Sequence, residues 1–190
     1  MMRMSPSLRP FVTVEAAREA GCREASALVL VYPLDGRAAV ALTLRGDEVP
    51  DHAGQVSLPG GGLRPGEDVI SAALREVFEE LGVPAASIEV VGGLTPLFIA
   101  PSRYCLYPVV GLARTRPDFR PDAREVVEVI ELPAAHLAQE GHVEERLVRG
   151  ETRRVPFFAV GRHKVWGATA MVLAELAALW PTDALATPRQ

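Results

Sequence analysis

The residues GGLRPGE at positions 61–67, followed after seven residues by REVFEELGV at positions 75–83, decide the fold. From residue 67 to residue 81 apolar side chains recur at spacings of three and four, which predicts an amphipathic helix. Gly82 and Pro84 end this helix, and the proline and glycine cluster at 59–62 interrupts regular structure just before it. The stretch therefore predicts a loop that leads into a helix.

Three glutamates on this helix predict a site for a divalent cation. Glu76, Glu79 and Glu80 stand at i, i+3 and i+4, so we expect their carboxylates to crowd one face, turned away from most of the apolar stripe. Carboxylate oxygens suit hard cations, which makes Mg²⁺ the first choice and Mn²⁺ the second. Such an ion would neutralise a diphosphate and lower the pKa of a bound water, while a glutamate removes a proton.

A simpler interpretation of these glutamates is a solvated helix face. Adjacent glutamates on a helix are usually exposed, and Arg75 with Glu79 fits an i, i+4 surface ion pair. For an isolated Glu-Glu pair this interpretation is favoured. Here the glycines, the arginine and the glutamates all stand at fixed intervals, and the complete spacing points to a functional site instead.

The spacing matches the Nudix box, which is Gly, five residues, Glu, seven residues and then Arg-Glu-apolar-any-Glu-Glu-any-Gly-apolar. The matching residues are Gly61, Glu67, Arg75, Glu76, Val77, Glu79, Glu80, Gly82 and Val83. The chain therefore resembles the Nudix hydrolases. This resemblance implies a Nudix fold, a loop-helix-loop metal site and hydrolysis of a nucleoside diphosphate linked to another moiety.

The resemblance also implies roles for individual residues. Glu76 and Glu80 correspond to the strongest metal ligands, with Glu79 as a third carboxylate. Arg75 and Glu67 would orient the site. A simpler role for Glu67 is that of a favourable acid in the first helical turn.

Nudix enzymes differ in which glutamate acts as the general base. Glu76 is the first candidate in this chain. Glu125 is the second, because family members often place another ligand or base in this region, just before an apolar strand. Glu128 and Glu131 fit a solvated strand face instead.

Segments on both sides of the box narrow the resemblance to the CoA-pyrophosphatase-like subgroup. They are LTLR at 42–45, HAGQVSLPGG at 52–61, PSRY at 101–104, YPVVG at 107–111, VPFF at 155–158 and VWGATA at 165–170. The match departs from the subgroup at three positions, where Pro50 replaces an arginine, Leu58 an aromatic residue and Gly46 a serine or alanine. Coenzyme A or a CoA derivative is the substrate that this resemblance implies.

The expected substrate contacts are Arg45, Gln55, Gly60, Gly61 and Arg103. A guanidinium can hold phosphate oxygens with two parallel donors, which makes Arg45 and Arg103 candidates for phosphate. Either could equally be a surface arginine. Gly61 would permit the tight loop before the helix.

The rest of the chain predicts an α/β fold, a layered α/β/α sandwich with a mixed sheet. Strands are expected at residues 27–33, 38–44, 88–94, 104–112, 126–132, 143–148 and 154–160, and further helices at residues 11–20, 133–139 and 168–180. For a chain of 190 residues we expect one domain over residues 1–182 and a flexible tail at residues 183–190.

Composition limits the classes of partner. A net charge of −4 gives no general attraction to polyphosphate backbones, so nucleic acid is disfavoured, and no apolar run approaches the length of a membrane span. Cys22 and Cys105 are far apart and lack a metal-binding spacing, so neither a disulfide nor a zinc site is indicated, and we expect a reducing cytoplasm. The oligomeric state is left open.

The predicted reaction is attack of water on a phosphorus of the CoA diphosphate, which releases adenosine 3',5'-bisphosphate and 4'-phosphopantetheine or its acyl form. One alternative is a Nudix pyrophosphatase that acts on NADH, ADP-ribose or a nucleoside triphosphate, since the same helix would serve. Another is a non-catalytic Nudix domain that binds a nucleotide or a protein. The intact carboxylates argue against the latter.

Overall fold

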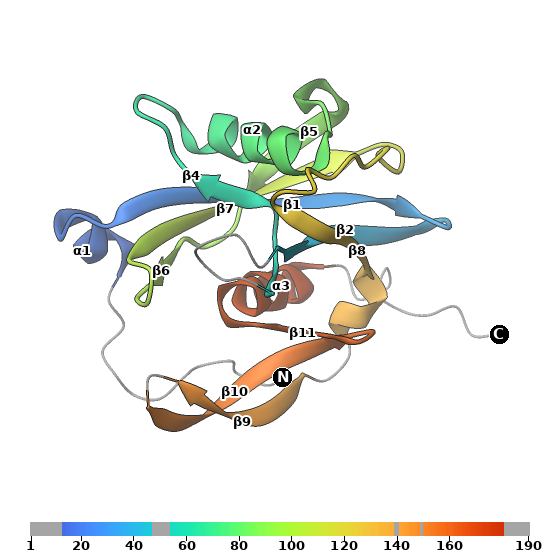
Figure 1. Cartoon of the computed structure of the whole chain (residues 1–190). Coiled ribbons are helices and arrows are strands. Elements are labelled where there is room, and N and C mark those ends of the chain that lie inside the picture. Colours follow the sequence, from blue (N-terminus) through green and yellow to red (C-terminus); the bar gives the residue numbers. More distant parts are fainter. Residues whose placement is uncertain (1–12, 47–53, 139–140, 149, 181–190) are drawn as a thin grey trace.

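The chain folds into layers of helix and sheet (Figure 1). The computed structural model describes residues 13–46, 54–138, 141–148 and 150–180. Helix α2 (Val69–Leu81) covers one face of a mixed eight-stranded sheet, and helix α3 (Gly167–Leu179) covers the other. This arrangement confirms the expected layered α/β/α sandwich. The expected tail at 183–190 and the segments 1–12, 47–53 and 139–140 lie outside the described residues.

The large sheet has the strand order β3-β2-β1-β7-β5, with β4 beside β1, β6 beside β7 and β8 beside β2. β1 and β7 run parallel, and the other described pairs run antiparallel. Its strands are β1 (Arg23–Leu34), β2 (Arg37–Arg45), β3 (Val56–Ser57), β4 (Gly60–Gly62), β5 (Ile88–Gly93), β6 (Leu97–Ile99), β7 (Tyr104–Ala113) and β8 (Val126–Pro133).

A second, three-stranded sheet has the order β11-β10-β9 and contacts α3. Its strands are β9 (His142–Val148), β10 (Glu151–Val160) and β11 (His163–Trp166), and the short helices of the chain are α1 (Val14–Glu19), η1 (Ala85–Ser87) and η2 (Ala134–Ala138). The strands expected at 143–148 and 154–160 are present as β9 and β10, which pair antiparallel, and β11 adds a third strand to them. Strands β3, β4, β6 and β11 were not expected, because two to four residues are too few to show a strand periodicity, and β4 lies within the cluster at 59–62 that was expected to interrupt regular structure.

Strand β1 lies in the middle of the large sheet and is buried on both faces. Leu28 and Leu30 pack on the α2 side, in the same cluster as Val77. Val29 packs on the α3 side, in the same cluster as Leu173. A strand covered on both faces carries a continuous apolar run rather than an alternating one, which explains why residues 27–33 predicted a buried strand. Full burial of one such side chain stabilises the fold by about 1.5–3 kcal/mol.

Helix α2 begins two residues later than expected because Asp68 caps it. The Asp68 Oδ1 atom accepts hydrogen bonds from the backbone N–H groups of Ile70 and Ser71 at 2.9 and 3.0 Å. These bonds satisfy donors that the first helical turn leaves unpaired. At the other end Gly82 adopts the left-handed conformation, with φ of 69°, which glycine does at no steric cost. The helix therefore ends where the sequence predicts.

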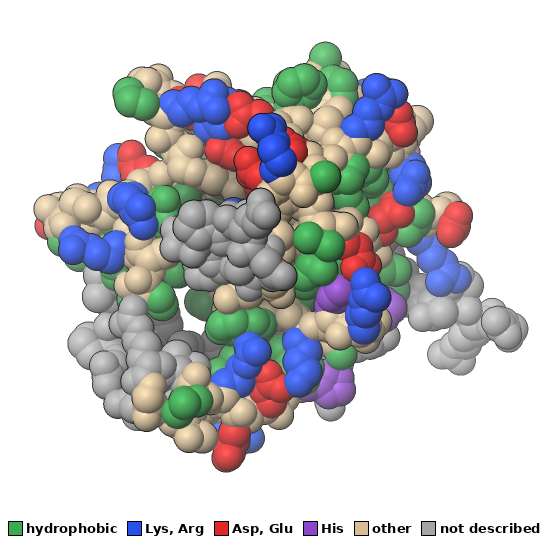
Figure 2. Space-filling view, in the orientation of Figure 1, with side chains coloured by type: hydrophobic (Ala, Val, Ile, Leu, Met, Phe, Trp, Pro, Cys, Tyr) green, Lys and Arg blue, Asp and Glu red, His purple; other side chains and the backbone are tan. Residues whose placement is uncertain are grey.

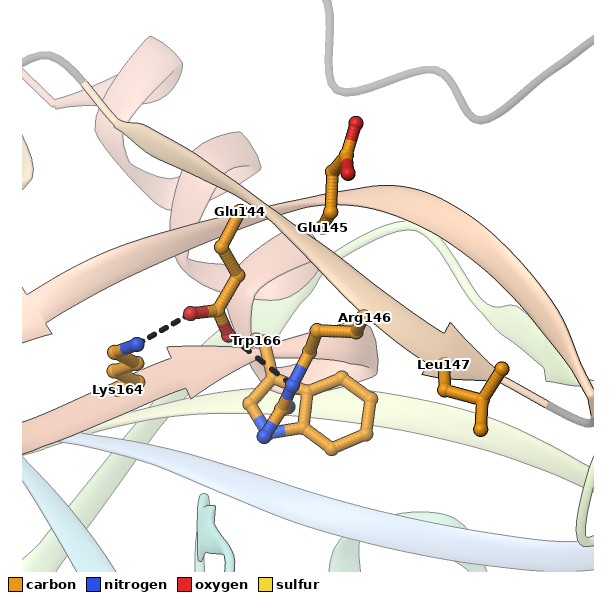
Figure 3. Close-up of a pocket in the computed structure, with 6 residues that line it drawn as sticks. All are labelled: Glu144, Glu145, Arg146, Leu147, Lys164 and Trp166. Atoms are coloured by element: carbon orange, nitrogen blue, oxygen red, sulfur yellow. Dashed lines mark hydrogen bonds and ion pairs between the residues drawn. The ribbon is translucent and has the colours of Figure 1, made fainter.

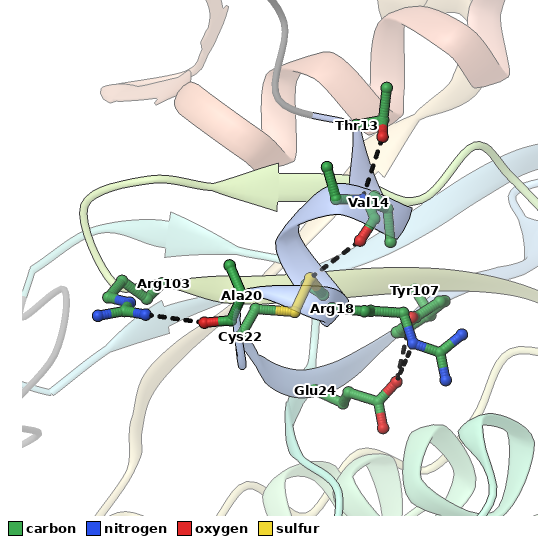
Figure 4. Close-up of a disulfide and its surroundings, with 10 residues drawn as sticks. Thr13, Val14, Arg18, Ala20, Cys22, Glu24, Arg103 and Tyr107 are labelled. Carbon is green, nitrogen blue, oxygen red and sulfur yellow. Dashed lines mark hydrogen bonds and ion pairs between the residues drawn. A yellow bond between two sulfur atoms is a disulfide. The ribbon is translucent and has the colours of Figure 1, made fainter.

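Cys22 and Cys105 form a disulfide whose Cα atoms lie 5.9 Å apart (Figure 4). The expectation that neither cysteine is disulfide-bonded is wrong. The two residues are separated by 83 positions, so their spacing carries no sign of the bond. The parallel pairing of β1 with β7 places Glu24 opposite Cys105, and Cys22 is thereby brought to the same end of the sheet.

Charged side chains of both signs intermingle over α2 and the loop that precedes it (Figure 2). This face carries no single-sign field that would attract a polyanion as a whole. Among the described residues, no helix is long and apolar enough to cross a membrane.

Candidate active site

Glu80 is the buried carboxylate of helix α2. Its side chain is 2 % exposed, whereas those of Glu76 and Glu79 are 14 % and 42 % exposed. Glu80 follows Val77 by three positions and precedes Leu81, so it stands on the apolar side of the helix. The expectation that the carboxylates turn away from the apolar stripe is therefore wrong for Glu80.

The carboxylate of Glu80 faces donors as well as other acids. Its Oε2 atom accepts a hydrogen bond from the Gly60 N–H at 3.3 Å, and its Oε1 atom lies 3.5 Å from Arg45 Nη1. Burial raises the pKa of Glu80 to about 8; the Arg45 charge opposes this rise, and the charges of Glu76 and Glu125 add to it. A carboxyl group shifted by burial and by like charges is typical of a functional site.

Arg75 joins three of the expected acids. Its Nε and Nη2 atoms donate to the two carboxylate oxygens of Glu67 at 2.7 and 2.8 Å. Its Nη1 atom donates to Glu76 Oε1 at 2.7 Å and to Glu79 Oε2 at 2.9 Å, and Nη2 also reaches the Gly62 carbonyl at 3.1 Å. Hydrogen bonds from Arg75 are the main cause that lowers the pKa of Glu67 to about 2. The surface pair of Arg75 with Glu79 is thus one contact in a larger network.

Arg64 is a site residue that the sequence analysis missed. Its Nη2 atom donates to both oxygens of Glu79, at 2.8 and 3.1 Å, and its backbone N–H donates to Glu67 Oε2 at 2.9 Å. Arg64 stands among the five residues of the box that have no fixed identity, so the motif carries no signal for it. It ties the loop to the helix through Glu79.

Gly60 and Gly61 bring the loop close to the carboxylates through the pairing of β4 with β1. A Cβ atom on Gly61 would lie 2.6 Å from the Glu76 carboxylate, and one on Gly60 would lie 2.3 Å from the Ser26 carbonyl oxygen. Real Cβ atoms essentially never approach neighbours this closely. The absence of side chains at these two positions therefore allows the loop to pack against Glu76 and β1.

Replacing Gly61 by alanine is expected to lower kcat and the affinity for Mn²⁺ about 10- to 100-fold, because the new methyl group displaces the Glu76 carboxylate. Steady-state kinetics and calorimetric titration with Mn²⁺ measure the two effects. Gly141→Ala is the matched control, since its Cβ would make only an ordinary contact, 3.6 Å from the Phe157 carbonyl oxygen. Wild-type kinetics in Gly61→Ala would show that the loop does not need this space.

The donor set around α2 fits a hard cation. The negative charges of Glu76 and Glu125 both act on Glu80, and a divalent ion would offset that repulsion. In the described residues no three acidic, histidine or cysteine side chains form a ready-made ligand group. Arg75 Nη1 lies 2.7 Å from Glu76 Oε1 and Arg45 Nη1 lies 3.5 Å from Glu80 Oε1, so guanidinium groups face two oxygens that a metal would take. Binding of a metal ion would require the Arg75 and Arg45 guanidinium groups to move away from these oxygens.

Other expected residues lie at the edge of this cluster or away from it. The Gln55 carbonyl accepts a hydrogen bond from the Arg45 N–H at 3.1 Å. Glu125 is exposed, and its carbonyl accepts from the Gly46 N–H at 2.9 Å. Arg103 lies apart, on the turn before β7, where its Nη2 atom donates to the Ala20 carbonyl at 3.2 Å (Figure 4).

A separate hollow of about 470 Å³ lies on the three-stranded sheet (Figure 3). In it Glu144 pairs with both Arg146 and Lys164, and the Arg146 guanidinium lies 4.4 Å from the centre of the Trp166 ring. None of the expected catalytic, metal or substrate residues lines this hollow. The carboxylate site and the hollow are therefore different places on the molecule.

Comparisons with known proteins agree with this geometry. The family model for the NUDIX domain matches residues 23–149. The chain is 36 % identical over 175 residues to a protein of Salmonella heidelberg named "Uncharacterized Nudix hydrolase NudL", and the match covers 90 % of this chain and 88 % of that one.

Solved structures show the same fold. The Nudix hydrolase RenU of Mycobacterium smegmatis superposes with a TM-score of 0.52 at 26 % identity, over 61 % of this chain and 73 % of that one. A crystal structure from Deinococcus radiodurans superposes with a TM-score of 0.53 at 17 % identity, over 91 % and 88 % of the two chains, and so shows the fold alone.

A loop and a helix that gather acidic side chains and arginines against an α/β sandwich define a hydrolase of pyrophosphate linkages. The chain belongs to the Nudix family and is a Nudix hydrolase. The alternative of a non-catalytic Nudix domain is thereby set aside.

Proposed function

We propose that this Nudix hydrolase cleaves the diphosphate linkage of coenzyme A or of CoA derivatives, giving adenosine 3',5'-bisphosphate and 4'-phosphopantetheine or its acyl form. The observation that carries the proposal is the position of Arg45. Its Nη1 atom lies 3.5 Å from Glu80, and its Nε atom is buried with no hydrogen-bond partner among the described residues. A buried donor beside the carboxylates suits a phosphate oxygen of the substrate.

The choice of coenzyme A among diphosphates comes from the segments around the box. LTLR at 42–45 ends at Arg45, and Gln55 and Gly60 belong to the segment that follows. Pro50 and His52 of the same motif lie outside the described residues. Gln55, Gly60 and Gly61 are the further substrate contacts in this proposal, and they lie beside Arg45, Glu80 and Glu76 respectively.

Mg²⁺ or Mn²⁺ is the proposed cofactor, with Glu76 and Glu80 as its ligands and Glu79 as a third carboxylate. When bound, the ion supplies charge neutralisation of the diphosphate and a water of lowered pKa. Arg75 and Glu67 hold the Glu76 carboxylate in place through their mutual hydrogen bonds.

The proton of the attacking water goes to a carboxylate of the chain in this proposal. Glu76 is the first candidate, since its oxygens face Gly61 of the loop. Glu125 is the second, since it is exposed and its charge reaches Glu80. General base catalysis of this kind contributes about 10²- to 10⁴-fold to the rate.

Among coenzyme A, NADH, ADP-ribose and nucleoside triphosphates, we expect coenzyme A to give the highest kcat/KM with Mg²⁺ or Mn²⁺. Chromatography of the products tests this, and adenosine 3',5'-bisphosphate identifies the expected cleavage. Glu80→Gln run in parallel removes any contaminating activity from the comparison. Preferential turnover of another compound would keep the Nudix reaction and refute coenzyme A as the substrate.

Three further properties belong to the same proposal. We propose one domain over residues 1–182, small molecules rather than nucleic acid or membrane as partners, and the cytoplasm as the compartment. Most cytoplasmic thiols are kept reduced, so the Cys22–Cys105 disulfide would be an exception in that compartment. Cell fractionation would locate the protein, and thiol alkylation before lysis would show whether Cys22 and Cys105 are bonded in that compartment.

A further inference from the structure

The turn at residues 100–103, which leads into β7, is held firmly against the start of β1. The Arg23 N–H donates to the Arg103 carbonyl at 2.9 Å, and Arg23 Nη2 donates to the Ser102 carbonyl at 2.9 Å. In return, Arg103 Nη2 donates to the Ala20 carbonyl at 3.2 Å. The disulfide joins the residues that flank this pair of segments (Figure 4). The turn is thus fixed from both sides.

This turn presents two positive charges that no carboxylate of the described residues neutralises. The guanidinium groups of Arg23 and Arg103 bind backbone carbonyls, which carry no net charge. Within the described part of the chain neither has a carboxylate at ion-pair distance, whereas neighbouring Arg18 pairs with Glu24 at 3.1 Å. The Ser102 hydroxyl is also buried there, without a hydrogen-bond partner in the part of the chain that the structure describes. Both the charges and the hydroxyl suit an anionic ligand.

The backbone of Arg103 is a second sign that the turn serves a ligand. Its φ is 57°, in the left-handed region that side-chain-bearing residues rarely adopt. Glycine or asparagine would take this conformation with less strain. Among the described residues Asp35 is the other non-glycine residue with positive φ, and the tight turn with Gly36 explains it. Strain of this kind, maintained by surrounding contacts, is often found at binding sites.

The turn lies next to the loop of the active site. The Tyr104 hydroxyl lies 4.0 Å from the point where a Cβ of Gly62 would stand, and the preceding residue, Gly61, faces the Glu76 carboxylate. The Arg23 guanidinium stacks over the Tyr104 ring at 4.2 Å from its centre. Successive positions of a strand point to opposite faces, so Tyr104 and the Glu76 carboxylate lie on the two sides of β4, and a ligand that joins the carboxylates to the turn has to pass around this strand.

We propose that Arg23 and Arg103 form a second phosphate subsite, which binds a phosphomonoester of the substrate rather than the diphosphate that is cleaved. The idea rests on the proposed function, since coenzyme A carries one such group, the 3'-phosphate of its adenosine half. A guanidinium offers two parallel donors to phosphate oxygens, and the carbonyl contacts already orient both side chains. The subsite favours substrates with this extra phosphate.

Calorimetric titration with adenosine 3',5'-bisphosphate and with adenosine 5'-monophosphate tests the subsite directly. We expect the wild-type protein to prefer the bisphosphate about tenfold or more, and Arg23→Gln and Arg103→Gly each to lose most of this preference. Arg114→Ala is the matched control, because Arg114 is 91 % exposed and pairs with Glu89 elsewhere on the sheet. Equal affinities in the wild type, or an unchanged preference in both variants, would overturn the proposal.

Arg103→Gly separates a lost contact from a lost fold. Glycine accepts the positive φ at this position, so the variant is expected to unfold at the wild-type temperature or above it. If Arg103→Gly binds the bisphosphate more weakly but is as stable as the wild type, the loss of affinity is due to the missing guanidinium. If the variant binds the bisphosphate as tightly as the wild type, Arg103 does not belong to a subsite.

Kinetics with coenzyme A and 3'-dephospho-CoA distinguish failure of the subsite from failure of the proposed function. The two variants are expected to raise KM for coenzyme A about tenfold while leaving its kcat and the KM for 3'-dephospho-CoA unchanged. Hydrolysis of both compounds with equal KM in the wild type would refute the subsite and keep the function. No hydrolysis of either, together with an Arg-dependent preference for the bisphosphate, would refute the function and keep the subsite.

Discussion

Glu80→Gln is expected to lower kcat roughly 10²- to 10⁴-fold, with the fold intact. Glutamine has the shape of glutamate and keeps an oxygen for the Gly60 N–H, but it cannot supply the negative charge that a divalent cation needs. Steady-state kinetics with Mg²⁺ and Mn²⁺ measure the loss. Glu89→Gln is the matched control, since Glu89 is 62 % exposed and its ion-pair partner among the described residues is exposed Arg114. Near-wild-type turnover in Glu80→Gln would remove Glu80 from the metal site.

The same variant also has a pH-dependent effect on stability in metal-free buffer. The folded-state pKa of Glu80 is about 8, above the ordinary value of 4.5, because burial disfavours its charge. As pH rises, Glu80 therefore loses its proton in the unfolded chain before it does so in the folded protein. The free energy of unfolding falls as pH rises from 4.5 through 8. Glu80→Gln removes this loss, so its free energy of unfolding should equal that of the wild type near pH 4.5 and exceed it at pH 8. Urea denaturation in the presence of EDTA measures the free energy of unfolding of the two proteins at each pH.

Removing the disulfide with Cys22→Ser and Cys105→Ser is expected to lower the free energy of unfolding by about 2–4 kcal/mol. The bond joins residues separated by 83 positions, so it restricts a long loop of the unfolded chain. The bonded Cys105 is also fully buried, and a serine hydroxyl there would need a new hydrogen-bond partner. Urea denaturation of the double variant and of the wild type gives the difference.

A reductant provides the control for the disulfide prediction. Dithiothreitol should lower the stability of the wild-type protein toward that of the double variant, and it should leave the double variant unchanged. Equal stability of the wild type with and without reductant, together with quantitative thiol labelling in both, would contradict a stabilising disulfide.

The sequence predicts those parts of the fold that rest on local patterns. Helix α2 follows from its apolar spacing, and only its start differs, because Asp68 rather than Glu67 begins the capped turn. Strand β1 follows from a continuous apolar run that both faces of the sheet require. The site residues of the Nudix box follow from their fixed intervals, and the helix and loop bring those residues together.

The features that the sequence does not predict depend on contacts between distant segments. The disulfide needs the parallel pairing of β1 with β7, and burial of Glu80 needs the packing of α2 against the sheet. Arg64 occupies a position with no fixed identity, and its role follows only from the distance to Glu79. Such arrangements come from tertiary packing, which one-dimensional periodicity does not record.

The network around Arg75 affects how substitutions at its acidic partners combine during evolution. Glu67, Glu76 and Glu79 each bond to the same guanidinium, so a change at one acid alters the charge and geometry that the other two experience. Effects of substitutions that share one partner do not add. In genetic terms the three positions are epistatic through Arg75. During evolution, the effect of a second substitution among these three acids would therefore depend on which acid was replaced first.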